Sequence, residues 1–283
     1  MITLFSTPKH FIDIFYIIQK NALKSWRALS PDIQIIIFGD SKGSKEAAKE
    51  IGAEHIPNVK CSPEGTPLLS DLFLQADKRA RYPIMTFINA DIILPEDFLK
   101  QIQIVSDYFN KFLIIGHRWD MDVEDKIEFN NDSEQQKFWD RVRIDSKKHA
   151  CTGIDYFIYK RFQWRTLPNF IIGRPGFDNW LIWKARRKLL PIIDATKVIQ
   201  AVHQNHYYDL NIRKREGNVN RELHKGKTLN ILDSTYKISK GKIAKKNDKN
   251  SVIRSLYRLP KIFPEIAILI KIYRRIYFRF VLK

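Results

Sequence analysis

The tripeptide Asn89-Ala90-Asp91 carries side chains that could bind a metal ion. The apolar run at residues 84–88 precedes it and is typical of a buried strand. A carboxylate at the C-terminal end of such a strand can hold a divalent cation, and that cation can hold a diphosphate. This interpretation predicts that the chain handles an activated sugar. Because Asn and Asp also form turns where strands end, a simple turn is the alternative.

The first half of the chain alternates predicted strands with predicted helices. The strands are continuous apolar runs, which favours a mostly parallel sheet covered by helices on both faces. Such a sheet brings the groups that follow its strands to one edge, here Ser6-Thr7, Asp40 and residues 89–91. The predicted strands are 2–5, 33–38, 55–56, 84–88 and 112–115, and the predicted helices are 11–29, 44–51, 68–80 and 98–109.

The second half is less regular. We expect helices over 132–144 and from Asp178 onward, with strands at 154–159, 191–193 and 198–202. Residues 208–250 are polar and basic without a strong period, so we predict a loop-rich lid or linker there. With 283 residues, the chain is long enough for one large α/β domain with a tail.

Positive charge is concentrated at the C-terminal end. The formal net charge is +18, and residues 240–283 supply a net +11 of it. A helix from Pro264 would align basic residues opposite an apolar side, as in a helix lying in a membrane surface. Docking of this helix on the protein itself and a nucleic-acid-binding arm are the alternatives. The aligned basic residues are Lys271, Arg275, Arg279 and Lys283.

Cysteine content and hydropathy exclude several classes of protein. The two cysteines, Cys61 and Cys151, form no C-x-x-C motif, which excludes a zinc ribbon and argues against a disulfide scaffold. No run of eighteen apolar residues occurs, so we expect no membrane span. We therefore predict a cytoplasmic protein that is peripheral on the inner face of the cell membrane.

Several segments occur in the order found in one enzyme family. The chain resembles GT-A-type glycosyltransferases, which use nucleotide-diphosphate sugars. Among them it is similar to glycosyltransferase family 2. The resemblance covers residues 2–206 and implies a catalytic domain over 1–207, with a nucleotide-sugar half at 1–115 and an acceptor half at 116–207. Residues 208–250 would follow as lid or linker, and 251–283 as a basic amphipathic helix. The ordered segments are Ser6-Thr7-Pro8, Asp40, Asn89-Ala90-Asp91, Gly153–Phe157, Gly176–Leu181 and Val202-His203.

The resemblance implies a metal site and a catalytic base. Asp91 and His203 would hold Mn²⁺ or Mg²⁺, and an imidazole ligand would favour Mn²⁺. His206 could serve as well as His203, and either could be an ordinary loop histidine. Asp178 would take the proton from an acceptor hydroxyl, although a carboxylate after Pro-Gly at a helix start is also a good N-cap. A single base of this kind implies an inverting transferase.

The resemblance also assigns binding residues. Asn89 departs from the family, which usually has Asp there, and an amide could still contact the ribose. Trp119 and Trp180 could stack on sugars or pack in the core, and Arg118 and Arg174 could meet phosphate oxygens. The predicted donor-binding residues are Thr7, Pro8, Asp40, Ser70, Asn89 and Asp91, and the predicted acceptor-binding residues are Trp119, Asp155 and Trp180.

The leading hypothesis is therefore an inverting glycosyltransferase of cell-surface glycan assembly, acting on a glycan or lipid-linked acceptor. A sugar nucleotidyltransferase shares the sheet plan, but it normally has a glycine-rich loop after the first strand, and Ser6-Thr7-Pro8-Lys9 has no glycine. A nucleic-acid-binding protein would spread basic residues over the folded domain. Here the excess lies in the tail and acidic groups follow the strands, so we expect no nucleic-acid partner.

Overall fold

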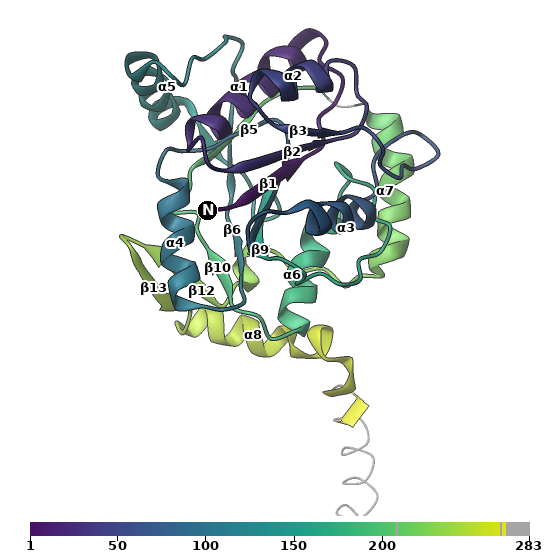
Figure 1. Ribbon diagram of the computed structural model, residues 1–283. Helices are drawn as coiled ribbons and strands as arrows, with labels where there is room; N and C mark the ends of the chain where they lie inside the picture. The colour runs from purple at the N-terminus through teal and green to yellow at the C-terminus, as the bar shows by residue number, and fades with distance from the viewer. Residues whose placement is uncertain (208, 267, 270–283) are drawn as a thin grey trace, which may run out of the picture.

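A nine-stranded mixed sheet forms the centre of the molecule (Figure 1). The computed structural model describes residues 1–207, 209–266 and 268–269. The strand order is β13-β12-β10-β6-β9-β4-β1-β2-β3. The strands are β1 (Thr3–Ser6), β2 (Gln34–Phe38), β3 (Glu54–Ile56), β4 (Ile84–Ile88), β6 (Leu113–Ile115), β9 (Tyr156–Lys160), β10 (Ile192–Asp194), β12 (Tyr236–Ser239) and β13 (Lys242–Lys245).

Most neighbouring strands of this sheet are parallel, as the sequence predicts. β9 runs antiparallel between β4 and β6, and β13 pairs antiparallel with β12 at the edge. β1, β2 and β4 are buried along their whole length, which explains their unbroken apolar runs. The carboxyl ends of β1 and β4 therefore lie side by side at one edge of the sheet.

Helices cover both faces of the sheet. α1, α2 and α4 contribute to the core on one face, and α3 and α6 contribute to the core on the other. In α1, Ile18, Ala22 and Trp26 are fully buried, so the predicted helical spacing does mark its inner side. The helices are α1 (Asp13–Ala28), α2 (Ser44–Glu50), α3 (Leu69–Arg79), α4 (Phe98–Tyr108), α5 (Asp132–Asp145), α6 (Phe177–Arg187), α7 (Leu210–His224) and α8 (Lys249–Ile262).

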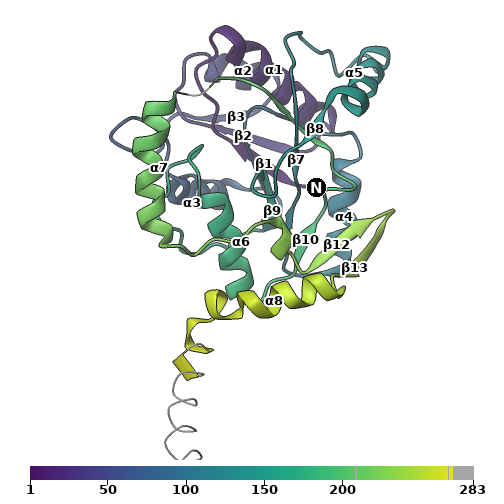
Figure 2. The ribbon, with the colours of Figure 1, turned by 180° about the vertical axis from the view of Figure 1, so that it is seen from behind.

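A second, four-stranded sheet joins distant parts of the chain. Its order is β5-β11-β7-β8, with β5 at Ile92–Ile93, β11 at Ala201–Gln204, β7 at Arg118–Met121 and β8 at Lys147–Lys148. Figure 2 shows β7 and β8 from the side opposite to Figure 1. In this sheet His203 pairs with Ile92 on β5 and with Asp120 on β7. The small sheet therefore brings His203 beside the segment that follows β4.

Residues 209–250 differ from the loop-rich lid or linker predicted for residues 208–250. The Asp209 side chain caps α7 by accepting hydrogen bonds from two backbone N–H groups. A 3-10 turn at Ile231–Asp233 precedes the β12–β13 hairpin, which extends the main sheet beside β10. Ile238 is fully buried. The polar composition hid these elements because α7 and an edge hairpin each bury few side chains.

α8 lies across the base of the molecule next to α6 (Figures 1 and 2). The Trp183 indole N–H donates to the carbonyl of Lys261 at 2.9 Å, and Ile262 is fully buried. The predicted basic stripe at residues 271–283 lies outside the described residues. Within the described part of the chain, no helix has the length and apolarity needed to cross a membrane.

Candidate active site

A cavity of about 690 Å³ opens at the edge of the main sheet where β1 and β4 end. Its walls come from segments far apart in the sequence: the ends of β1, β4 and β11, the start of α6 and part of α7. Seven of the residues predicted for the site line it: Thr7, Pro8, Asn89, Asp91, Asp155, Asp178 and His203. The fold thus brings the predicted metal ligands and the predicted base into one cavity.

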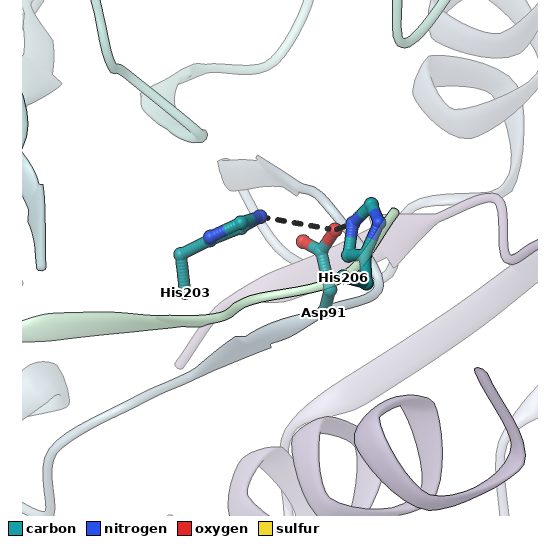
Figure 3. Close-up of side chains that lie close together, drawn as sticks. All are labelled: Asp91, His203 and His206. Atoms are coloured by element: carbon teal, nitrogen blue, oxygen red, sulfur yellow. Dashed lines mark hydrogen bonds and ion pairs between the residues drawn. The ribbon is translucent and has the colours of Figure 1, made fainter. Parts of the chain in front are cut away.

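Asp91, His203 and His206 form a cluster that could hold a metal ion. One potential ligand atom from each lies within 4.8 Å of the other two. The Asp91 Oδ2 atom is 3.0 Å from His206 Nε2 and 3.7 Å from His203 Nε2. In Figure 3 the carboxylate lies between the two imidazole rings. Both histidines that the sequence offered as alternatives therefore belong to the same cluster.

Backbone contacts fix the position of Asp91. The chain turns after β4, with the Ile92 N–H donating to the Asn89 carbonyl at 3.3 Å, and β5 then pairs with β11. The side-chain amide of Gln204, which is fully buried, donates to the Asp91 carbonyl at 3.1 Å. These hydrogen bonds fix the backbone at Asp91, whose side chain lines the cavity.

The unpaired atoms of this cluster suit a cation. Asp91 Oδ1 and His203 Nε2 are buried, and neither has a hydrogen-bond partner among the described residues. Burial opposes ionisation of Asp91, but His203 and His206 outweigh it and lower the pKa of the carboxyl to about 2. One carboxylate and two imidazoles form a donor set typical of Mn²⁺ and other transition metals. The residues present therefore fit the metal that the sequence predicts.

Asp120 holds His203 from the side away from Asp91. Its Oδ1 atom lies 3.1 Å from His203 Nδ1 and 2.9 Å from Arg118 Nε, and its Oδ2 atom contacts His149. A carboxylate behind a ligating imidazole fixes the orientation of the ring and raises its basicity. Trp119 was predicted as a site residue from the sequence, whereas Asp120 was not. The alternation of side chains along a strand could have revealed it, because successive residues point to opposite faces.

Asn89 is part of a buried network with Asp155. Its Nδ2 donates to Asp155 Oδ1 at 2.6 Å, and Arg118 Nη1 lies 3.1 Å from Asp155 Oδ2. The backbone N–H of Asn89 donates to the Asp155 carbonyl at 3.0 Å. An aspartate at position 89 would place a second carboxylate against Asp155. An amide at position 89 therefore suits this network, because it can donate to Asp155.

Asp178 lies in the first turn of α6 and is not the N-cap residue, which is Gly176. Gly176 has a φ of 110°, a conformation that glycine adopts without strain, and its N–H donates to Asp178 Oδ1 at 3.1 Å. Burial and, to a lesser degree, the charge of Asp155 raise the pKa of Asp178 to about 7. A carboxyl group with this pKa is well suited to accept a proton near neutral pH.

Four predicted binding residues do not line the cavity. Trp180 is 5% exposed and packs in the core, with its ring 5.2 Å from that of Phe170, so it is not available to a sugar. The Ser70 hydroxyl donates to Asn169 Oδ1 at 2.6 Å. Asp40 is exposed, and Trp119 lies within β7. The apolar residues at helical spacing around Trp180 therefore belong to the core, because α6 packs the side that carries them against the sheet.

No family model and no curated protein matches the sequence. The structure is similar to glucosyl-3-phosphoglycerate synthase from Mycobacterium tuberculosis in complex with Mg²⁺ and UDP, with a TM-score of 0.49 and 13% identity over 87% of this chain and 86% of that one. A complex of the same enzyme with Mn²⁺, UDP and phosphoglyceric acid gives 0.48 and 13%, over 80% and 78%.

TarS from S. aureus in complex with UDP-GlcNAc is similar over 43% of this chain and 35% of its own, with a TM-score of 0.33 and 12% identity. The chain is thus similar in structure to these solved enzymes, at 12–13% sequence identity.

Proposed function

We propose that the protein is a metal-dependent glycosyltransferase that moves a sugar from a nucleotide-diphosphate sugar to an acceptor hydroxyl. The observation that carries this proposal is the content of one cavity: the Asp91–His203–His206 cluster lines it together with Asp178, whose pKa is raised to about 7. A leaving diphosphate needs positive charge, and an acceptor hydroxyl needs a base. The cavity supplies residues for both requirements.

The metal-binding residues serve the leaving group. Asp91, His203 and His206 would hold Mn²⁺ or Mg²⁺, which when bound supplies positive charge for the oxygens of the departing diphosphate. Asp120 keeps the His203 ring oriented through Nδ1. Thr7, Pro8 and Asn89, also in the cavity wall, are the proposed contacts of the nucleotide. Ser41 lines the cavity in place of its neighbour Asp40.

Asp178 serves the acceptor. In the proposed step its ionised carboxylate takes the hydroxyl proton while the acceptor oxygen bonds to the anomeric carbon. The bond from that carbon to the diphosphate oxygen breaks, and the nucleoside diphosphate leaves with the bonding electrons. One displacement with one base inverts the anomeric carbon. Asp155 is a structural neighbour in this scheme, since both its oxygens are engaged by Asn89 and Arg118.

We propose that α8 places the enzyme on an anionic membrane surface on the inner side of the cell membrane, in assembly of a surface glycan. The outward side of α8 is apolar, and its Arg254 and Arg258 turn inward to Asp233, at 3.9 and 3.4 Å. An exposed apolar stripe on a helix of a basic chain suits insertion into a lipid interface. The exposed residues are Val252, Ile253, Leu256 and Tyr257, the last 83% exposed.

A donor screen tests the proposed reaction. Purified protein is incubated with Mn²⁺ and a panel of nucleotide-diphosphate sugars, with and without acceptors, and released nucleoside diphosphate is measured. We expect turnover with at least one donor, loss of turnover with Asp91→Ala, and an inverted anomeric configuration by NMR. Turnover that survives Asp91→Ala unchanged would refute the metal site, and a retained configuration would refute the role of Asp178.

A further inference from the structure

Arg118 lines the cavity but is paired with Asp120 and Asp155. Three further lysine and arginine side chains line the cavity in addition to the metal cluster and Asp178. They are Lys9, which follows β1, Arg174, in the loop before α6, and Arg213, on α7. The reaction proposed above uses none of them. Their convergence from three separate segments is the observation from which a further binding site follows.

Arg174 is held in place by a buried carboxylate. Its Nε donates to Glu216 Oε2 at 2.6 Å, and Glu216 is 3% exposed. Glu216 also accepts hydrogen bonds from the hydroxyls of Ser62, at 2.6 Å, and Thr66, at 3.0 Å. Glu216 therefore ties α7 to two loops of the cavity wall and fixes the guanidinium of Arg174 there. A charged donor fixed in this way loses little conformational freedom when it binds an anion.

Arg213 lies on the same side of α7 as Glu216, because residues three apart are neighbours on a helix surface. α7 is attached to the loop before α6 by Asn220, whose Nδ2 donates to the Ile171 carbonyl at 3.0 Å and whose Oδ1 accepts from the Ile171 N–H at 2.8 Å. Arg213 and Arg174 are thus parts of one connected wall.

The charges of the three residues interact. Partial burial lowers the pKa of Lys9, and the charges of Arg174 and Arg213 lower it further, whereas Asp91 raises it. Glu216 already pairs with Arg174, and a phosphate bound beside Lys9, Arg174 and Arg213 would add further negative charge to these three positive side chains. Phosphate matches this set because guanidinium groups bind its oxygens with paired, charge-assisted hydrogen bonds.

We propose that Lys9, Arg174 and Arg213 bind a phosphate group carried by the acceptor. Arg174 is four residues before Asp178, so this site adjoins the base that would receive the acceptor hydroxyl. The leaving diphosphate of the donor has the metal cluster as its own partner. This inference rests on the proposed function and narrows it: the acceptor belongs to the class of phosphorylated alcohols, sugars or lipids.

Binding measurements on the full chain test the site without knowledge of the natural acceptor. The protein is saturated with Mn²⁺ and UDP, and binding of glycerol 3-phosphate and of glycerol is measured by calorimetry. We expect glycerol 3-phosphate to bind and glycerol not to bind. Because a hydrogen bond to a charged group contributes about 1.5–3 kcal/mol, Arg213→Gln should weaken glycerol 3-phosphate by about tenfold or more. UDP affinity should change less than about twofold in Arg213→Gln, as expected for a side chain that makes no charge-assisted contact with the donor.

Arg221→Gln is the matched control, because Arg221 is an exposed arginine near the end of the same helix and outside the cavity lining. It should leave both affinities unchanged. If Arg213→Gln weakened the binding of UDP as much as that of glycerol 3-phosphate, the cations would belong to the donor site and the proposal would be overturned. Binding of glycerol 3-phosphate to the wild-type protein that is no tighter than binding of glycerol would also overturn it. If neither UDP nor any other nucleoside diphosphate binds the wild-type protein, the proposed function fails, and the acceptor site fails with it.

Discussion

The protonation of Asp178 should control both the activity and the stability of this protein. The pKa of Asp178 is raised from 3.8 to about 7, chiefly by burial. Only the ionised carboxylate can act as a base. If the pKa is about 7, the ionised fraction, and with it kcat/KM, should fall about tenfold for each pH unit below about 6. We expect a single acidic limb in the pH profile of kcat/KM, with an apparent pKa near 7.

The same shift predicts the sign of a stability change. Between pH 3.8 and about 7 the folded protein binds a proton that the unfolded chain has lost, so the free energy of unfolding falls as pH rises. A shift of about three units at about 1.4 kcal/mol per unit corresponds to at most about 4 kcal/mol lost by pH 8. The loss is complete above pH 7 and absent near pH 4.

Asp178→Asn should therefore separate the two effects. The amide keeps the size of the side chain but cannot accept a proton, so kcat should fall by about 100-fold or more. At pH 8 the variant should be more stable than wild type by up to about 4 kcal/mol, and near pH 4 the two should match. Urea unfolding at several pH values measures the second effect, and initial rates measure the first.

Asp132→Asn is a suitable control, since Asp132 is exposed in the first turn of α5, outside the cavity lining. A rate that is constant from pH 5 to pH 8 would refute the role of Asp178 as base. An Asp178→Asn variant that is less stable than wild type at pH 8 would show that the environment of Asp178 favours the charged form, which contradicts the raised pKa.

Asp120→Asn should weaken Mn²⁺ binding by about 10- to 100-fold through loss of the carboxylate behind the imidazole ligand, as measured by calorimetry. Asn89→Asp should lower the free energy of unfolding by about 1–3 kcal/mol at pH 7, because a like charge replaces the hydrogen bond to Asp155. The loss should be smaller at pH 4, where one of the two carboxylates can bind a proton. Chemical denaturation at both pH values measures this difference. Leu256→Asp with Tyr257→Asp should abolish flotation with vesicles of anionic lipid, because charges would replace the exposed apolar side of α8.

Each of these experiments has a control or an outcome that contradicts it. Unchanged Mn²⁺ affinity in Asp120→Asn would show that the His203 ring needs no orienting carboxylate. A loss of stability in Asn89→Asp that is equal at both pH values would point to a steric cause. For flotation, Ile144→Asp is the matched control, because Ile144 is 83% exposed on α5. Equal flotation of all variants would exclude α8 as the lipid contact.

The long apolar elements were predictable from the sequence, because burial imposes a pattern on them. Residues 84–88 are buried throughout as β4, and this run correctly located Asp91 at the edge of the sheet. The short strands β5, β7 and β8 were missed, since two to four residues carry no period. Asp120 and the pairing of His203 with β5 depend on those strands, so the support of the metal site could not be predicted.

Long-range contacts decided the remaining differences. Trp180 has the spacing and chemistry of either a core residue or a sugar platform, and its packing against Phe170 makes it core. Tyr236–Ser239 forms a strand because it pairs with the free edge of β10, and no local sequence pattern predicts that pairing. The sequence alone also gave no sign that Glu216 would contact Arg174, since only the folded loops bring them together.

The pairing of β5 with β11 joins Asp91 to His203 across more than a hundred residues. During synthesis, the aspartate emerges long before either histidine, so a nascent chain that ends before β11 has one ligand of the cluster and no means of assembling it. In the proposed metal-dependent enzyme, metal capture would therefore report completion of the domain. A protease cut between β7 and β11 that let the fragments separate would release the ion, even though every ligand would remain chemically intact.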